Sequence, residues 1–67
     1  MVSLTVNGAP YRFDTCPSVA ALIAELGLVG KRIAVERNGD IVPRSSFADQ
    51  QLADGDRLEI VVAVGGG

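Results

Sequence analysis

The side chains that most often carry out chemistry in proteins are scarce in this sequence. It contains no histidine, and Cys16 is its single cysteine. Proton transfer and nucleophilic attack most often use such residues, and zinc and iron–sulfur sites need clusters of them. Most enzyme chemistries therefore lack their usual side chains here, and we expect a protein that binds no metal and no cofactor of its own. Cys16 itself is expected to be an incidental loop thiol.

The residues that could take part in chemistry are instead at the C-terminus, where Gly65, Gly66 and Gly67 follow an apolar segment. Glycine lacks a Cβ and reaches backbone angles closed to other residues, so a glycine tether can pass through a narrow channel. The alternative interpretation is a frayed chain end or a cloning remnant. The position of the glycines, directly after a predicted strand, favours the functional interpretation and predicts a mobile tail.

The reactive group of such a tail would be the α-carboxylate of Gly67. A terminal carboxyl group has a pKa of roughly 3.3–3.7, so it is ionised and unreactive towards nucleophiles at neutral pH. It becomes an acyl donor only after activation, for example as an acyl-adenylate. The sequence has no phosphate-binding loop, so a partner enzyme must bind the ATP.

Composition limits the remaining classes of function. The chain has 67 residues, 48% of them hydrophobic, and a net charge of −2. This length allows one domain, and the charge balance provides no basic face for nucleic acid. No apolar run approaches the roughly 20 residues that span a bilayer, and no signal peptide is evident at the N-terminus. We expect a cytoplasmic protein that contacts neither nucleic acid nor membrane.

Two segments at the start of the chain alternate apolar and polar residues and predict strands, at 2–6 and 11–13. Asn7-Gly8 between them is typical of a tight hairpin turn. Residues 18–26 carry apolar side chains at helical spacing behind Ser18, a good N-cap, and Gly27 is expected to end this helix.

The second half of the chain predicts three more strands. Residues 33–37 and 41–42 flank a second hairpin signal, Asn38-Gly39. The last strand, from Leu58 to Val64, is apolar on both faces near its end, which is typical of a strand in the middle of a sheet.

This order of elements predicts an α+β fold in which one helix packs on one face of a mixed sheet of four to five strands. With the last strand beside the first and parallel to it, the arrangement is the β-grasp, or ubiquitin-like, fold. The expected organisation is a domain over residues 1–64 followed by a flexible tail over residues 65–67.

Several short segments, in this order, resemble the ThiS family of sulfur carriers in thiamine biosynthesis over the whole chain. They are Val6-Asn7-Gly8, Pro17-Ser18-Val19, residues 34–44 (AVERNGDIVPR), Leu52-Ala53-Asp54-Gly55-Asp56, Glu59-Ile60-Val61 and Val64-Gly65-Gly66-Gly67. The segment at 34–44 is the most specific of them.

The resemblance implies a carrier and co-substrate of partner enzymes, which is not itself an enzyme. An E1-like adenylyltransferase of the ThiF type would use ATP to adenylate the carboxylate of Gly67. A persulfide, charged from cysteine by a desulfurase, would convert it to a thiocarboxylate. Thiazole synthase of the ThiG type would then take the sulfur for the thiazole of thiamine. Because Gly67 is the last residue given, we expect no maturing protease.

Other members of the same fold class remain as alternatives. A sulfur carrier for molybdopterin synthesis ends similarly, and a ubiquitin-like protein modifier would use its tail to form isopeptide bonds with lysines. For docking to a partner enzyme, Val61 and Ala63 are predicted to form an apolar patch on the sheet face opposite the helix, with Arg44 or Arg57 at its rim.

Overall fold

A computed structural model of the chain describes residues 1–63. The predicted end of the domain at Val64 and the predicted tail at residues 65–67 lie outside the described residues. The elements are β1 (Val2–Val6), β2 (Ala9–Phe13), α1 (Val19–Glu25), β3 (Ile33–Arg37), β4 (Asp40–Val42), a 3-10 turn η1 (Arg44–Ser46) and β5 (Arg57–Val62).

Both predicted hairpin turns are present. Asn7 and Gly8 have φ values of 50° and 84°, and Asn38 and Gly39 have φ values of 51° and 91°. Two successive residues with positive φ make the turn type whose twist matches that of the flanking strands. β2 begins at Ala9, slightly earlier than predicted.

The helix forms where its sequence pattern predicts it. The Ser18 side chain accepts a hydrogen bond from the Ala21 N–H in the first turn. At the other end Gly27 has a φ of 73°, and the Leu28 N–H donates back to the Ile23 carbonyl. This left-handed residue and backward bond satisfy carbonyl groups that a helix end leaves without partners.

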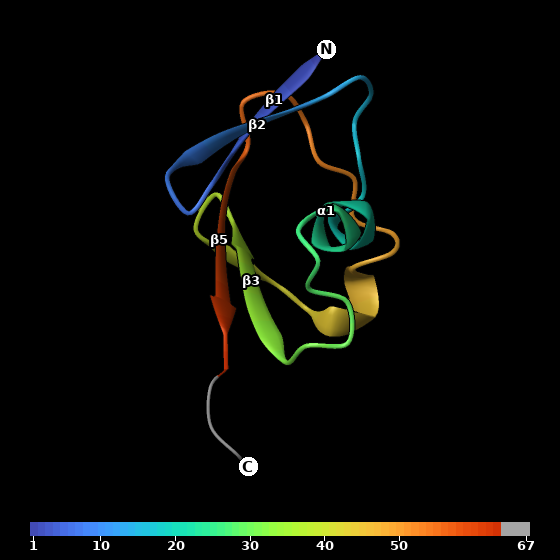
Figure 1. The fold of residues 1–67 in the computed structure, drawn as a ribbon, viewed down its shortest axis with the longest axis vertical. Helices are drawn as coiled ribbons and strands as arrows, with labels where there is room; N and C mark the ends of the chain where they lie inside the picture. The colour runs from blue at the N-terminus through green and yellow to red at the C-terminus, as the bar shows by residue number, and fades with distance from the viewer. Residues whose placement is uncertain (64–67) are drawn as a thin grey trace.

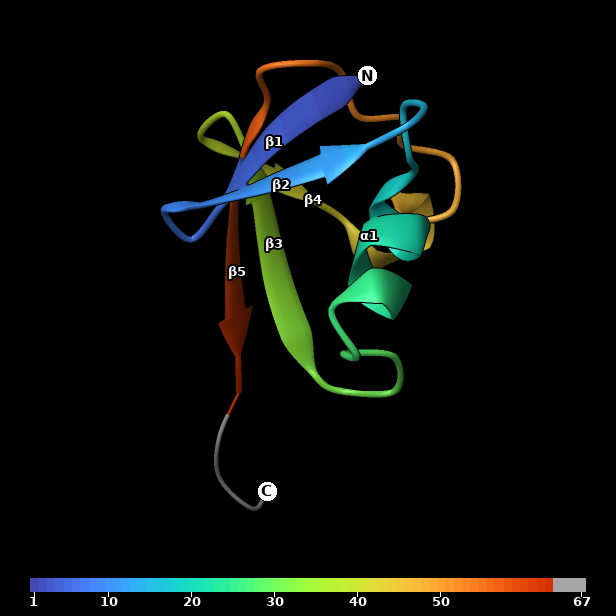
Figure 2. The ribbon, with the colours of Figure 1, turned by 45° about the horizontal axis from the view of Figure 1, so that its top comes forward.

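The strands form one mixed sheet in the order β2-β1-β5-β3-β4. β5 is the central strand, parallel to β1 on one side and antiparallel to β3 on the other. The helix and η1 lie on one side of this sheet, and β5 leads downward out of the domain towards the C-terminus (Figures 1 and 2). This arrangement confirms the predicted β-grasp fold.

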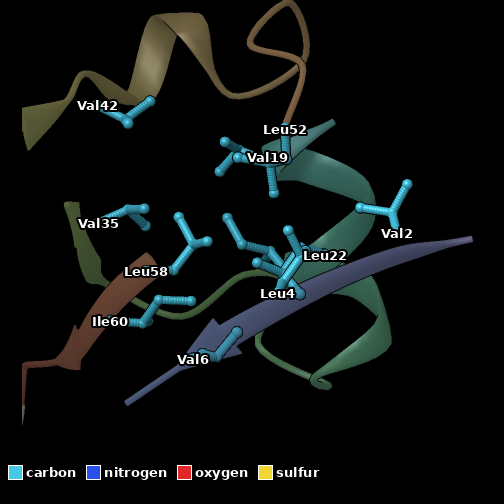
Figure 3. Packing of buried hydrophobic residues seen from close by; sticks show 11 residues of the cluster. Val2, Leu4, Val6, Val19, Leu22, Val35, Val42, Leu52, Leu58 and Ile60 are labelled. Atoms are coloured by element: carbon cyan, nitrogen blue, oxygen red, sulfur yellow. The ribbon is translucent and has the colours of Figure 1, made fainter. Parts of the chain in front are cut away.

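The core fills the space between the sheet and the helix, where side chains of β1, β3, β5 and α1 meet (Figure 3). Its buried members are Val2, Leu4, Val6, Val19, Leu22, Ile23, Val35, Val42, Leu52, Leu58 and Ile60. Burying each such side chain contributes roughly 1.5–3 kcal/mol to folding. The core therefore fixes the position of the first part of β5, through Leu58 and Ile60.

The alternation along β5 would place Val62 in the core beside Ile60, but Val62 is 38% exposed. Its neighbour across the sheet is Ile33, which is itself only partly buried. This end of β5 therefore extends beyond the packed core, and its apolar side chains face solvent.

Candidate functional site

The part of the structure that bears on function is β5, because it leads directly towards the glycines at 65–67. Those glycines lie outside the described residues, so the site is described up to Ala63. β5 is bonded to a neighbour on each side at its start, whereas only β3 accompanies it at its end.

On the β1 side, Asn7 marks the point where pairing stops. The last main-chain bond runs from the Asn7 N–H to the Leu58 carbonyl, at 2.9 Å. The Asn7 side chain then takes over: its Nδ2 donates to the Ile60 carbonyl at 2.9 Å, and its Oδ1 accepts from the Ile60 N–H at 2.8 Å. A side-chain amide carries the same donor and acceptor as a peptide group, so Asn7 extends the ladder by one residue after the β1 backbone has turned away.

Asn38, the asparagine of the other hairpin turn, bonds to the start of β5. Its Oδ1 accepts from the Arg57 N–H at 2.9 Å, and its Nδ2 donates to Asp56 at 3.0 Å. The same residue type at the same turn position therefore holds β5 from opposite sides. Local sequence patterns assign both asparagines to turns only, since nothing near them in the sequence indicates what lies across the fold.

Asp56 is the buried carboxylate at the base of β5. Besides Asn38, it accepts hydrogen bonds from Arg37 Nε at 2.7 Å and from the Ala53 N–H at 2.8 Å. Burial alone would raise the pKa of Asp56, but these hydrogen bonds and the charge of Arg37 outweigh it and hold the pKa below its ordinary value. The position of this ion pair indicates a structural role.

The predicted docking residues fall in two places. Val61 is 63% exposed on the sheet face opposite the helix, beside Ala34 of β3, and Ala63 is also exposed. Arg57 begins the same strand and is exposed. Arg44 is instead in η1, where it lines a groove on the helix side of the sheet.

That groove is small and largely apolar. Its volume is about 200 Å³, and its lining includes Ile23, Leu28, Ile33, Phe47 and Arg44. Pockets for cofactors and small ligands usually have volumes of about 300–1,000 Å³, so this groove is smaller than is usual for such pockets. Within residues 1–63, no group of three or more histidine, cysteine, aspartate or glutamate side chains is placed to hold a metal ion.

Cys16, the one thiol of the sequence, is exposed in the loop between β2 and α1. This loop and the C-terminal end of β5 lie towards opposite ends of the molecule (Figure 1). The described part of the chain therefore places the thiol away from the strand end that leads to the glycines. In the same part of the chain, no helix is long and apolar enough to cross a membrane.

A five-stranded mixed sheet with this strand order, one helix on one face, and a central C-terminal strand defines the ubiquitin-like β-grasp class. The sequence profile of the ThiS family matches residues 4–67. The chain belongs to the ThiS family.

Individual relatives agree with this assignment. The sulfur carrier protein ThiS of Bacillus subtilis is 34% identical over 67 residues, which cover the whole of both chains. The crystal structure of ThiS from Geobacter metallireducens superimposes with a TM-score of 0.81 at 33% identity, covering 98% of this chain and 100% of that one.

A thiazole synthase of Paramagnetospirillum magneticum is also similar, with 47% identity over 66 residues. This match covers 98% of the present chain but 20% of the relative, and a thiazole synthase of Magnetococcus marinus shows the same proportions at 30% identity. The chain thus spans about a fifth of the length of these relatives.

Proposed function

We propose that this protein is a sulfur carrier of thiamine biosynthesis, and that its reactive group is the α-carboxylate of Gly67. The observation that carries the proposal is the full-length match to the Bacillus subtilis carrier, which runs to Gly67 itself. The fold supports it, because the central strand is fixed at its base and leads out of the domain directly before the glycines.

The chemistry proceeds in three steps on partner enzymes. A carboxylate oxygen of Gly67 attacks the α-phosphate of ATP, and pyrophosphate leaves. A persulfide formed by a cysteine desulfurase then attacks the acyl carbon and AMP leaves. Reductive cleavage of the sulfur–sulfur bond by a thiol yields the thiocarboxylate. The partner supplies ATP binding and catalysis, and the carrier supplies the tethered carboxylate, so the carrier acts as a co-substrate and binds no cofactor.

Two enzymes are the proposed partners. An E1-like adenylyltransferase activates Gly67, and thiazole synthase takes the sulfur. Support for the second partner comes from relatives named thiazole synthase in which a segment similar to this whole chain makes up about a fifth of the protein. Covalent joining raises the effective concentration of two domains that act on one another. Because adenylation needs ATP, we place the carrier in the cytoplasm.

Docking is proposed to use the outer sheet face around Val61, Ala34 and Ala63. These residues form a small exposed apolar surface at the end of β5, as expected of a protein contact. Arg57 lies on the same strand, four positions before Val61, and can serve at the rim of this surface. Arg44, on the helix side, would contact only a partner that reaches round the domain.

The test is intact-protein mass spectrometry after incubation with the adenylyltransferase, ATP and a sulfur source. The wild-type chain should gain the mass of one oxygen-to-sulfur exchange, located on Gly67. Deleting Gly67 shortens the tether by roughly 3.3–3.6 Å. Since a misplacement of 1 Å can cost about a hundredfold in rate, this variant should be essentially inactive.

The matched control is Cys16→Ser, which removes the one competing sulfur nucleophile and should leave the mass gain unchanged. If Cys16→Ser abolishes the gain and deletion of Gly67 does not, the proposed function is wrong. If incubation of the chain with lysate and ATP instead attaches it to other proteins, seen as a ladder of conjugates of increasing mass, the chain is a protein modifier.

A further inference from the structure

The open edge of β5 at Val62 differs from the other edges of the sheet. In an antiparallel pair, bonded and non-bonded residue pairs alternate. The Ala63 N–H donates to the Arg32 carbonyl at 2.9 Å, which makes these two a bonded pair. Val62 and Ile33, the next pair, are therefore non-bonded, and the main-chain N–H and C=O of Val62 point away from β3.

Nothing in residues 1–63 pairs with Val62 on that other side. The ladder between β1 and β5 includes Thr5 with Arg57 and Val6 with Leu58, and Asn7 then satisfies both main-chain groups of Ile60. Beyond Asn7 the hairpin of β1 and β2 turns away, and β5 continues past its tip with that side uncovered (Figures 1 and 2).

The two outer edges of the sheet are protected against strand pairing. On β2, Pro10 lies opposite Thr5 of β1. The Thr5 N–H donates to the Asp56 carbonyl, away from β2, so Thr5 and Pro10 are a non-bonded pair. The Pro10 nitrogen, which carries no N–H, therefore faces the solvent side of β2. Arg12, the next residue on that side, is charged. β4 is only three residues long and is followed by Pro43. Such features prevent a sheet edge from pairing with another chain.

The end of β5 has none of these features. Val61 and Val62 are uncharged and are 63% and 38% exposed, on opposite faces of the strand. An extended segment with alternating apolar side chains could therefore bond to the Val62 main chain and cover both valines. Such strand addition is a recurring mode of peptide recognition.

We infer that the edge of β5 at Val62 is a strand-addition site for an extended segment of the enzyme that receives the tail. The inference rests on the proposed function, since an enzyme that takes Gly67 binds a residue only five positions after Val62. Asn7 is the boundary of the site: it completes the ladder of the domain at Ile60 and leaves the next position for the partner.

The test removes one main-chain donor by chemical synthesis of the chain with N-methyl-valine at position 62. The matched control is N-methyl-isoleucine at position 41. Ile41 pairs with Glu36 on β3. The Asn38 N–H donates to Arg57, and since bond directions alternate along a strand, the main-chain groups of Glu36 also point towards β5 and away from β4. Glu36 and Ile41 are therefore a non-bonded pair, and the Ile41 N–H points outward from the opposite edge of the sheet. Both changes remove an outward-facing donor from an exposed strand, so both chains should fold like the wild type.

Binding of each chain to the purified adenylyltransferase and to purified thiazole synthase is then measured. The change at Val62 should weaken binding to at least one enzyme about 5- to 10-fold, the effect of one lost hydrogen bond, while the change at Ile41 stays within about twofold. In the wild type, amide exchange at Val62 should slow at least about tenfold when that enzyme is saturating.

The inference is wrong if the two N-methylated chains bind equally well and the Val62 amide exchanges in both complexes as fast as in the free protein. The proposed function would be unaffected by that result. If the Val62 amide of the free protein exchanges more slowly as the protein concentration rises, the strand that pairs with Val62 belongs to a second copy of the chain, and the inference is wrong. If the wild type binds neither enzyme, the proposed function fails, and the wild-type titration shows this before any variant is made.

Discussion

The two ends of β5 differ in strand pairing and in burial. Its start is bonded on both sides, buried through Leu58 and Ile60, and anchored by Asp56. Its end, at Val61 and Val62, is paired on one side and exposes apolar side chains. A carrier needs this contrast, because the tether must begin at a fixed point while its other end reaches into partner sites. Stability should therefore depend on the start of β5, and partner reactions on its end.

The largest stability effect is expected for Asp56→Ala. It removes the acceptor of three hydrogen bonds and leaves Arg37 without its partner. Because Arg37 is partly exposed, we expect a loss of about 2–3 kcal/mol in the free energy of unfolding, measured by urea denaturation. Asp49→Ala, at an exposed carboxylate, should change it by no more than about 0.5 kcal/mol. Similar losses in both variants would show that Asp56 does not anchor β5.

The same residue predicts the acid sensitivity of the fold. Since the pKa of Asp56 is lower in the folded than in the unfolded chain, the unfolded chain binds more protons between the two values. The stabilisation is therefore present above the unfolded pKa of about 3.9 and is lost as pH falls through the folded pKa. Asp56→Asn should show a smaller loss of stability than the wild type over this acidic range.

A somewhat smaller effect is expected for Asn7→Gly. Glycine accepts the φ of 50° without strain but removes both side-chain hydrogen bonds to Ile60. We expect a loss of about 1–2 kcal/mol, and faster amide exchange at Ile60 than at Arg57 relative to the wild type. Asn38→Gly is the matched variant, at a φ of 51°, and should show the reverse pattern because its side chain bonds Arg57. Identical exchange patterns would remove the distinction between the two turns.

At the other end of the strand, Ala63→Glu should affect partner binding and leave the fold intact. Ala63 is exposed, and its N–H bond to Arg32 does not involve the side chain. A charge placed in an apolar contact should raise the apparent KM for adenylation about tenfold, equivalent to about 1.4 kcal/mol. Steady-state release of pyrophosphate measures this value. An unchanged KM would place the contact on another face.

The smallest effect is expected in the middle of β5, where Glu59 lies directly across from Glu36. Like charges at opposed positions in a sheet are destabilising, so Glu59→Gln should stabilise the fold by a few tenths of a kcal/mol. Thermal unfolding at low salt, where screening is weakest, is the most sensitive measurement. A loss of stability would mean that Glu59 has a favourable contact that outweighs this repulsion.

Much of the fold follows from local patterns in the sequence. Alternation and the Asn-Gly pairs predict the hairpins, and the doubly apolar end of the last strand predicts its position in the middle of the sheet. What local patterns do not reveal are contacts across the fold. The bond from Asn7 to Ile60 joins residues 53 positions apart, and the pairing of Arg37 with Asp56 joins residues 19 apart. Exposure of Val62 likewise depends on where the packed core ends, which alternation along one strand does not encode.

The most direct test of the carrier role follows the sulfur itself. The chain is charged on Gly67 with an isotopically heavy sulfur, purified, and given to thiazole synthase with its other substrates and unlabelled sulfide in excess. Mass spectrometry then measures the label in the thiazole product. If the chain is a sulfur carrier, the thiazole product carries the heavy sulfur, with no more than one labelled molecule formed per charged chain. The chain itself is recovered with an ordinary carboxylate on Gly67. Thiazole that carries only unlabelled sulfur, with the label still on Gly67, would contradict the account.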